Sequence, residues 1–379
     1  MSLYTPPLNE IIRKQGGLLD STDFPEPMKK SLDAISKRAT DTIRMVTSQL
    51  SITYPIHFGI IDDFGFNAFA TKGSEEYFIG INRGLIATVN LVFSRIFADP
   101  RLFPYLGDVS LESTELPLLE RLAFRFEYTT EMLPLFDPPK CPMRSSYAYH
   151  LKQLALDFIL AHEITHIVNG HVDYPFRNNA DLYLDELADN SSRSVRIGMT
   201  SKALELDADT WATEMLLTSE FLKCAGVSPY PKNMRFFYKR PGLVLIQFTQ
   251  VIAVLFKIFG DHRLNASTFN SDNYPKPRLR FTICKRMMYK TTALNAVAKK
   301  MNFDMKKDML SLGIEAGFKD IEHAFEAITG KPSDNVGIEQ SNGELGDSQI
   351  RYIIDYWNEN LVDHLSSRAH IKILPKEYF

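Results

Sequence analysis

Cysteine is scarce in this 379-residue sequence, which contains only Cys141, Cys224 and Cys284, far apart and without a CxxC pair. Such a sparse, odd-numbered set argues against a disulfide framework and against a zinc site built from thiolates. An excess of charge of either sign is also missing, because 43 lysines and arginines stand against 46 aspartates and glutamates. We therefore expect no nucleic acid as partner and have no electrostatic reason to expect an anionic membrane.

Long hydrophobic runs are absent as well. Residues 1–17 contain prolines and charges where a signal peptide would have an apolar segment. The most apolar stretch, GLVLIQFTQVIAVLF at 242–256, falls short of the roughly 20 residues that span a bilayer, and polar residues interrupt it. We expect a buried core helix there, no stable membrane insertion, and a cytoplasmic, reduced protein.

The spacing of apolar residues predicts an α+β fold that is mainly helical. Residues 1–27 are expected to form an N-terminal arm, and residues 28–281 one domain with an insertion at 98–145. Within this domain the pattern predicts strands at 52–61, 64–71 and 77–82, which we expect to form a small antiparallel sheet. Residues 282–379 are expected to form a helical C-terminal region with a flexible interruption at 330–349. The predicted helices cover 28–50, 84–97, 145–169, 201–222 and 242–259.

The segment HEITH at 162–166 matches H-E-x-x-H on the predicted helix 145–169. Residues i and i+4 lie one turn apart on the same face, so His162 and His166 can reach one zinc ion. Glu163 would then take a proton from the activated water and pass it to a leaving amine. The alternative is a core helix whose histidines are hydrogen-bonded and bind nothing.

A catalytic zinc usually has three protein ligands, so a third is needed. His171 lies five residues after His166, one fewer than in the H-E-x-x-H-x-x-G-x-x-H pattern of metzincins. A helix that stops at Gly170 would need a different turn to bring His171 back to the metal. We expect His171 to cap the helix or to pack against a ligand.

Glu205 is the better candidate for the third ligand. Glu205 and Asp209 are four residues apart and share a helix face, whereas Asp207 points away from both. One carboxylate of the pair can bind the metal while the other accepts a hydrogen bond from a ligating histidine. Glu186, in LDELAD, remains the rival.

These residues resemble the gluzincin metallopeptidases of the CAAX-protease/HtpX type. LELDADTWAT (204–213) is similar to the family's E-x-x-A-D-x-x-A motif, and FNAFATKGSEEYFIGINRGLI (66–86) to its strand, hairpin and following helix. YPKPRLRF (274–281) resembles the H-P-x-x-x-x-R-I motif, with Arg280 at the position of the family's arginine. Together with HEITH, these motifs follow the family's order over residues 30–285.

The resemblance implies a zincin-type metallopeptidase core that hydrolyses peptide bonds with one Zn2+ per chain. It implies His162, His166 and Glu205 as zinc ligands and Glu163 as general base. It also implies that Asp209 hydrogen-bonds to a ligand.

The resemblance further implies where a peptide would bind. The strand of Asn67, Ala68, Phe69 and Ala70 would be the edge on which an extended substrate pairs, as in strand addition to a sheet. We therefore expect a protein or peptide substrate; the sequence does not predict the oligomeric state.

Two departures from the family stand out. Tyr274 replaces the family's histidine, and its phenol could still donate a hydrogen bond to a developing oxyanion. His262 is a weaker candidate for the same role. The transmembrane helices of the membrane members are absent. A phage-exclusion or ImmA/IrrE-like regulatory protease and a non-catalytic zinc-containing regulatory or interaction protein remain the alternatives.

Overall fold

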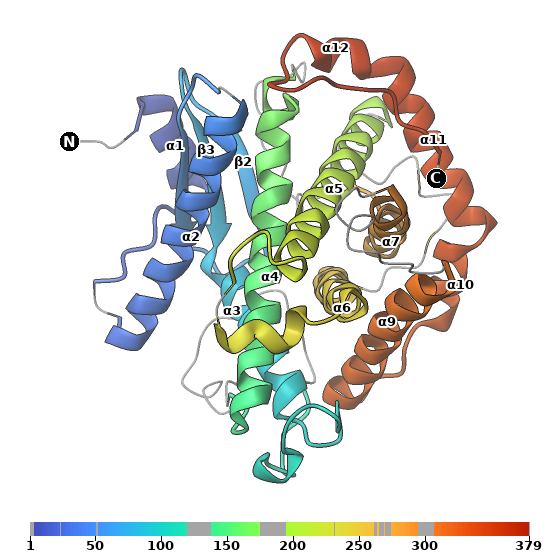
Figure 1. Ribbon diagram of the computed structural model, residues 1–379. Coiled ribbons are helices and arrows are strands. Elements are labelled where there is room, and N and C mark those ends of the chain that lie inside the picture. Colours follow the sequence, from blue (N-terminus) through green and yellow to red (C-terminus); the bar gives the residue numbers. More distant parts are fainter. Residues whose placement is uncertain are drawn as a thin grey trace.

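The computed structural model describes residues 4–22, 24–50, 52–119, 138–174, 195–230, 232–260, 264, 269, 274–294 and 307–378. In this part of the chain one small sheet lies at one side of a larger array of helices (Figure 1), which confirms a mainly helical α+β fold. The elements in chain order are α1 (Pro6–Lys14), α2 (Glu26–Leu50), β1 (Ile56–Ile61), β2 (Ala68–Lys72), β3 (Tyr77–Asn82), α3 (Arg83–Ala98), η1 (Val109–Leu111), α4 (Pro142–Val168), η3 (His171–Asp173), α5 (Val195–Cys224), η4 (Lys232–Tyr238), α6 (Pro241–Phe259), α7 (Pro277–Leu294), α9 (Lys307–Thr329), α10 (Asn335–Asn342), α11 (Glu344–Asn360) and α12 (Val362–Ser366).

The sheet has the order β1-β3-β2 and is mixed rather than antiparallel. β2 and β3 form the predicted antiparallel hairpin, whereas β1 pairs in parallel with the other side of β3. β3 is the central strand, paired on both sides, and all of its residues are buried, as expected for a strand covered on both faces. β2 begins later than predicted, since the Asp63 carboxylate accepts the Gly65 amide at 2.6 Å and forms a turn before the strand.

The N-terminal arm contains a helix. α1 buries Leu8 and Ile12 against Phe69 and Phe78 of the sheet. The chain then makes a bridge between Leu18 and Ile61 at the outer side of β1. α1 therefore covers one face of the sheet, and the segment after it runs along the outer edge of β1, opposite the edge formed by β2.

α4 is the long helix at the centre of the molecule. It lies between the sheet and α5 (Figure 1) and is buried along most of its length. Pro142 occupies its first turn, where a missing amide hydrogen does no harm, and Gly170 follows its end with a φ of 74°. Two predicted features of this helix, its length and its stop, are confirmed.

α6 corresponds to the most apolar stretch of the sequence. By length and composition it could cross a membrane, but 72% of its most apolar window is buried inside the protein. Its residues contribute to the largest hydrophobic cluster together with residues of α3, α4 and α9. The prediction of a buried core helix is confirmed.

The C-terminal helices are part of this packing. The boundary proposed after residue 281 falls within α7, and α9 contacts α6 along its length. The flexible interruption expected at 330–349 is wrong, because α10 and the start of α11 occupy it. Turn-forming residues adopt helices here since Ser341, Gln349 and Ile350 are buried against neighbouring elements.

Candidate metal centre

The helices α4 and α5 bring the predicted metal ligands together. Nε2 of His162 lies 3.1 Å from Nε2 of His166 and 3.3 Å from Oε2 of Glu205. The other carboxylate oxygen of Glu205, Oε1, lies 3.6 Å from Nε2 of His166. One ligand atom from each residue falls within 4.8 Å of the other two. These distances arise because the two histidines lie one turn apart on α4 and face one side chain of α5.

These three residues fit a zinc ion. Two imidazoles and one glutamate form one of the usual donor sets of catalytic zinc, which leaves a fourth position open. All three side chains are almost completely buried, with His162 at 3% and Glu205 at 0% exposure. Two ring nitrogens and a carboxylate facing one another in a dry interior are what a divalent cation would stabilise.

Asp209 orients the first histidine. Its Oδ1 lies 3.1 Å from Nδ1 of His162, and Arg280 of α7 donates to both of its oxygens at 2.7 and 2.8 Å. Burial alone would raise the pKa of Asp209, but the Arg280 guanidinium and its hydrogen bonds lower it. Asp209 therefore stays ionised and can accept the Nδ1 proton of His162, which leaves Nε2 facing His166 and Glu205.

Arg280 also acts on Glu205, whose Oε2 lies 3.2 Å from its Nη2. Burial would raise the pKa of Glu205, yet Arg280 and His162 together hold it below its ordinary range. The same two carboxylates, Glu205 and Asp209, outweigh desolvation and raise the pKa of His162. Burial and the neighbouring His162 lower the pKa of His166.

The second histidine is oriented through an additional residue. Nδ1 of His166 lies 2.8 Å from Nδ1 of His171, whose Nε2 lies 3.1 Å from Oδ2 of Asp207. Lys376, near the C-terminus, contacts the other oxygen of Asp207 at 2.7 Å. The prediction that His171 packs against a ligand agrees with this contact. Neither Asp207 nor Lys376 was predicted as part of the site, because Asp207 faces away from Glu205 on its helix and Lys376 comes from a distant segment.

Glu163, the predicted general base, is 2% exposed and lines a small cavity beside His162. The cavity measures about 10 Å3, which is room for roughly one water molecule. Arg280 and the aromatic rings of Phe256 and Phe259 close its other side. Glu163 can therefore exchange a proton with a molecule in this cavity, but a peptide does not fit there as the side chains stand.

The remaining predicted residues have different outcomes. Tyr274 lies just before α7 with a buried hydroxyl, and its catalytic role stays a prediction. Asn67 precedes β2, which is the edge strand of the sheet and packs against α4. Its use by a substrate also stays a prediction. Glu186 and His262 lie outside the described residues.

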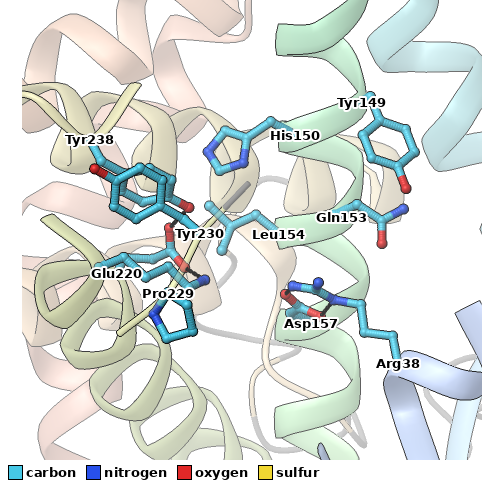
Figure 2. Close-up of a pocket in the computed structure, with 11 residues that line it drawn as sticks. Arg38, Tyr149, His150, Gln153, Leu154, Asp157, Glu220, Pro229, Tyr230 and Tyr238 are labelled. Carbon is cyan, nitrogen blue, oxygen red and sulfur yellow. Dashed lines mark hydrogen bonds and ion pairs between the residues drawn. The ribbon is translucent and has the colours of Figure 1, made fainter. Parts of the chain in front are cut away.

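A separate pocket of about 220 Å3 lies beside the first half of α4 (Figure 2). Its charged groups are already paired with each other: Arg38 donates to Asp157 at 2.6 Å, and the Tyr238 hydroxyl donates to Glu220 at 2.8 Å. None of the three candidate metal ligands lines it. The two sites on α4 are therefore distinct, and only the HEITH site combines converging ligands with a nearby general base.

The comparisons with known proteins point to the same region. A family model described as Peptidase U49 matches residues 135–288, the part of the chain that contains HEITH, Glu205, Asp209 and Arg280. Searches of curated proteins and of solved structures found no significant match. The family match supports a peptidase without singling out the CAAX-protease/HtpX type.

Proposed function

We propose that this chain is a zinc-dependent endopeptidase of the gluzincin kind. His162, His166 and Glu205 would hold one Zn2+ per chain, and Glu163 would be the general base. The observation that carries the proposal is the convergence of these three ligand atoms within 4.8 Å, next to a cavity lined by Glu163.

The chemistry divides between the ion and the chain. Bound zinc supplies a Lewis acid that polarises a peptide carbonyl and lowers the pKa of a water molecule. Glu163 would accept a proton from that water and deliver it to the leaving amine nitrogen. Arg280 and Asp209 would keep His162 in the tautomer that presents Nε2, and the buried surroundings would exclude other solvent.

Substrate access requires a rearrangement. Phe256 and Phe259, at the end of α6, lie against the cavity and against the guanidinium of Arg280, whose carbon is 5.1 and 5.8 Å from the two rings. We propose that these rings move when a substrate enters. A peptidase whose cleft is closed at rest would not degrade proteins indiscriminately.

An extended protein or peptide segment would then pair with β2. This strand has β3 on one side, is the edge of the sheet, and packs on the helix that carries HEITH. Strand addition would give main-chain hydrogen bonds that hold the substrate in register. The three free cysteines are in keeping with a reduced compartment, so we place the proposed activity in the cytoplasm.

The test compares Glu163→Gln with Glu214→Gln, which changes an exposed glutamate on α5. We expect Glu163→Gln to retain zinc and to lose roughly 10²–10⁴-fold in kcat/KM on a cleaved peptide or protein. Glu214→Gln should leave both unchanged. Equal activity of the wild type, Glu163→Gln and Glu214→Gln would rule out Glu163 as the base. Zinc binding by the wild type without any cleavage would favour a non-catalytic zinc protein.

A further inference from the structure

The chain after α12, residues 367–378, forms a strap that crosses the end of α4 and the middle of α5. The amide of His370 donates to the carbonyl of Val168 at 2.7 Å, so the strap begins at the last turn of α4. It passes so close to Gly170 that a Cβ there would lie 2.9 Å from the amide nitrogen of Ala369. Gly170 thus both ends α4 and lets the strap cross it.

The far end of the strap is fixed to α11. Asn358 holds Lys376 by two hydrogen bonds, accepting its amide at 2.7 Å and donating to its carbonyl at 2.9 Å. The indole of Trp357 donates to the carbonyl of Leu374 at 3.2 Å, and the Lys376 ammonium lies 5.0 Å from the centre of its ring. These contacts determine where the ammonium of Lys376 points.

That ammonium ends a chain of contacts that starts at His166. If Nε2 of His166 is to face a metal, its proton resides on Nδ1 and is donated to Nδ1 of His171. His171 must then carry its own proton on Nε2, which points at the Asp207 carboxylate. The other oxygen of the same carboxylate lies 2.7 Å from the Lys376 ammonium, so Asp207 sits between His171 and Lys376.

The two ligating histidines are thus held in similar ways. His162 donates directly to Asp209, which Arg280 keeps in place, whereas His166 acts through His171 on Asp207, which Lys376 keeps in place. Both aspartates lie on α5, and each is paired with a cation from a later part of the chain.

We propose that His171, Asp207 and Lys376 are positioning residues that fix the orientation and tautomer of His166, and that the strap thereby sets the affinity of the metal site. This inference rests on the proposed function, because it takes His166 as a zinc ligand. A cavity of about 420 Å3 is lined by the strap and by the helices α5 and α7. Displacing the strap would withdraw Lys376 from Asp207 and loosen the second histidine.

The experiment measures the zinc dissociation constant of the full-length protein by competition with a chromophoric chelator. Asp207→Asn should weaken zinc binding by roughly 10- to 100-fold, the usual effect of removing a group that orients a ligating histidine. Lys376→Met, which keeps the apolar stem, should weaken it by up to about 10-fold, and Lys376→Arg should restore most of the affinity. Lys372→Met is the matched control, because this lysine lies on the same strap, is exposed, and makes no hydrogen bond or ion pair within the described residues.

A second readout separates orientation from stability. In the cobalt-substituted protein, Lys376→Met should alter the visible absorption bands, which report ligand geometry, while Lys372→Met should not. Urea unfolding of the zinc-free proteins measures any general loss of stability, and the Lys376 variant stays informative if Asp207→Asn does not fold. Wild-type zinc affinity and cobalt spectrum in Lys376→Met would overturn the positioning role. His166→Ala distinguishes the two claims: if it abolishes zinc binding while Lys376→Met does not weaken it, the proposed function stands and only this inference fails.

Discussion

Arg144 offers the sharpest test of how the structure supports α4. Its guanidinium is completely buried in the first turn of the helix. It donates at 2.7–3.1 Å to five backbone carbonyls of the preceding segment, those of Phe97, Asp99, Leu102, Phe103 and Leu106. We predict that Arg144→Met strongly destabilises the protein.

The magnitude follows from what the arginine leaves behind. The Glu112 carboxylate lies 3.6 Å from Nε of Arg144, is 1% exposed, and accepts the amides of Lys140 and Cys141 at 2.9 Å. Removing the arginine therefore leaves a buried charge that keeps its two amide donors but loses its cation. Loss of one member of a buried pair costs about 3–5 kcal/mol. The carbonyls add to this, although water reaching them would limit their contribution. Arg144→Lys should fall between the two, because an ammonium has three donors for five acceptors.

The assay is urea unfolding of the full-length protein, with Arg44→Met as control. Arg44 is an arginine on α2 whose side chain is 72% exposed and pairs with Asp41, itself 47% exposed, and such exposed pairs contribute about 0–1 kcal/mol. We expect Arg144→Met to lose several times more unfolding free energy than Arg44→Met. Similar losses in the two variants would refute the view that Arg144 organises this segment.

Three further predictions concern the strap, an ion pair and the metal. Gly170→Ala should lower the free energy of unfolding by about 1–2 kcal/mol, because alanine would have to adopt the left-handed φ of 74°. Contact of the added Cβ with Ala369 should increase the loss, which urea unfolding measures. Burial would raise the pKa of Glu322, but Arg278 and Lys257 lower it below its ordinary value of 4.5. The ionised carboxylate therefore stabilises the fold above pH 4.5, and this stabilisation is lost as the pH falls through the lowered pKa. The difference in unfolding free energy between wild type and Glu322→Gln should therefore be largest near neutral pH and shrink below about pH 5. Removing zinc with a chelator should lower the free energy of unfolding. The expected loss is about 4 kcal/mol relative to protein in free zinc at 1,000 times the dissociation constant, and thermal unfolding with and without zinc measures it.

Local patterns in the sequence predicted the helices that build the site. α4 has apolar residues throughout, a proline at its start and a glycine after its end, so its length and its stop could be foreseen. The spacing of His162 and His166, and of Glu205 and Asp209, follows from one helical turn and holds wherever such helices form. That the two pairs face each other at 3.1–3.6 Å depends on how α4 packs on α5, which periodicity does not specify.

The features that escaped prediction depend on distant segments. Nothing in the residues of β1 indicates that it pairs in parallel with β3, because β3 is not the next strand in the chain: β2 lies between them in sequence and pairs with the other side of β3. α10 contains residues typical of turns, and packing against its neighbours makes it helical. Lys376 is an ordinary surface residue by sequence, and only the path of the strap brings it to Asp207.

The central claim is that Glu205 completes a zinc site begun by HEITH. Elemental analysis of the purified protein after equilibration with zinc tests it most directly, with Glu205→Ala beside the wild type and Glu214→Gln as control. We predict one zinc per chain in the wild type and in Glu214→Gln, and a large loss in Glu205→Ala. Full zinc content in Glu205→Ala would contradict the assignment of this ligand, and a wild type without zinc would contradict the account as a whole.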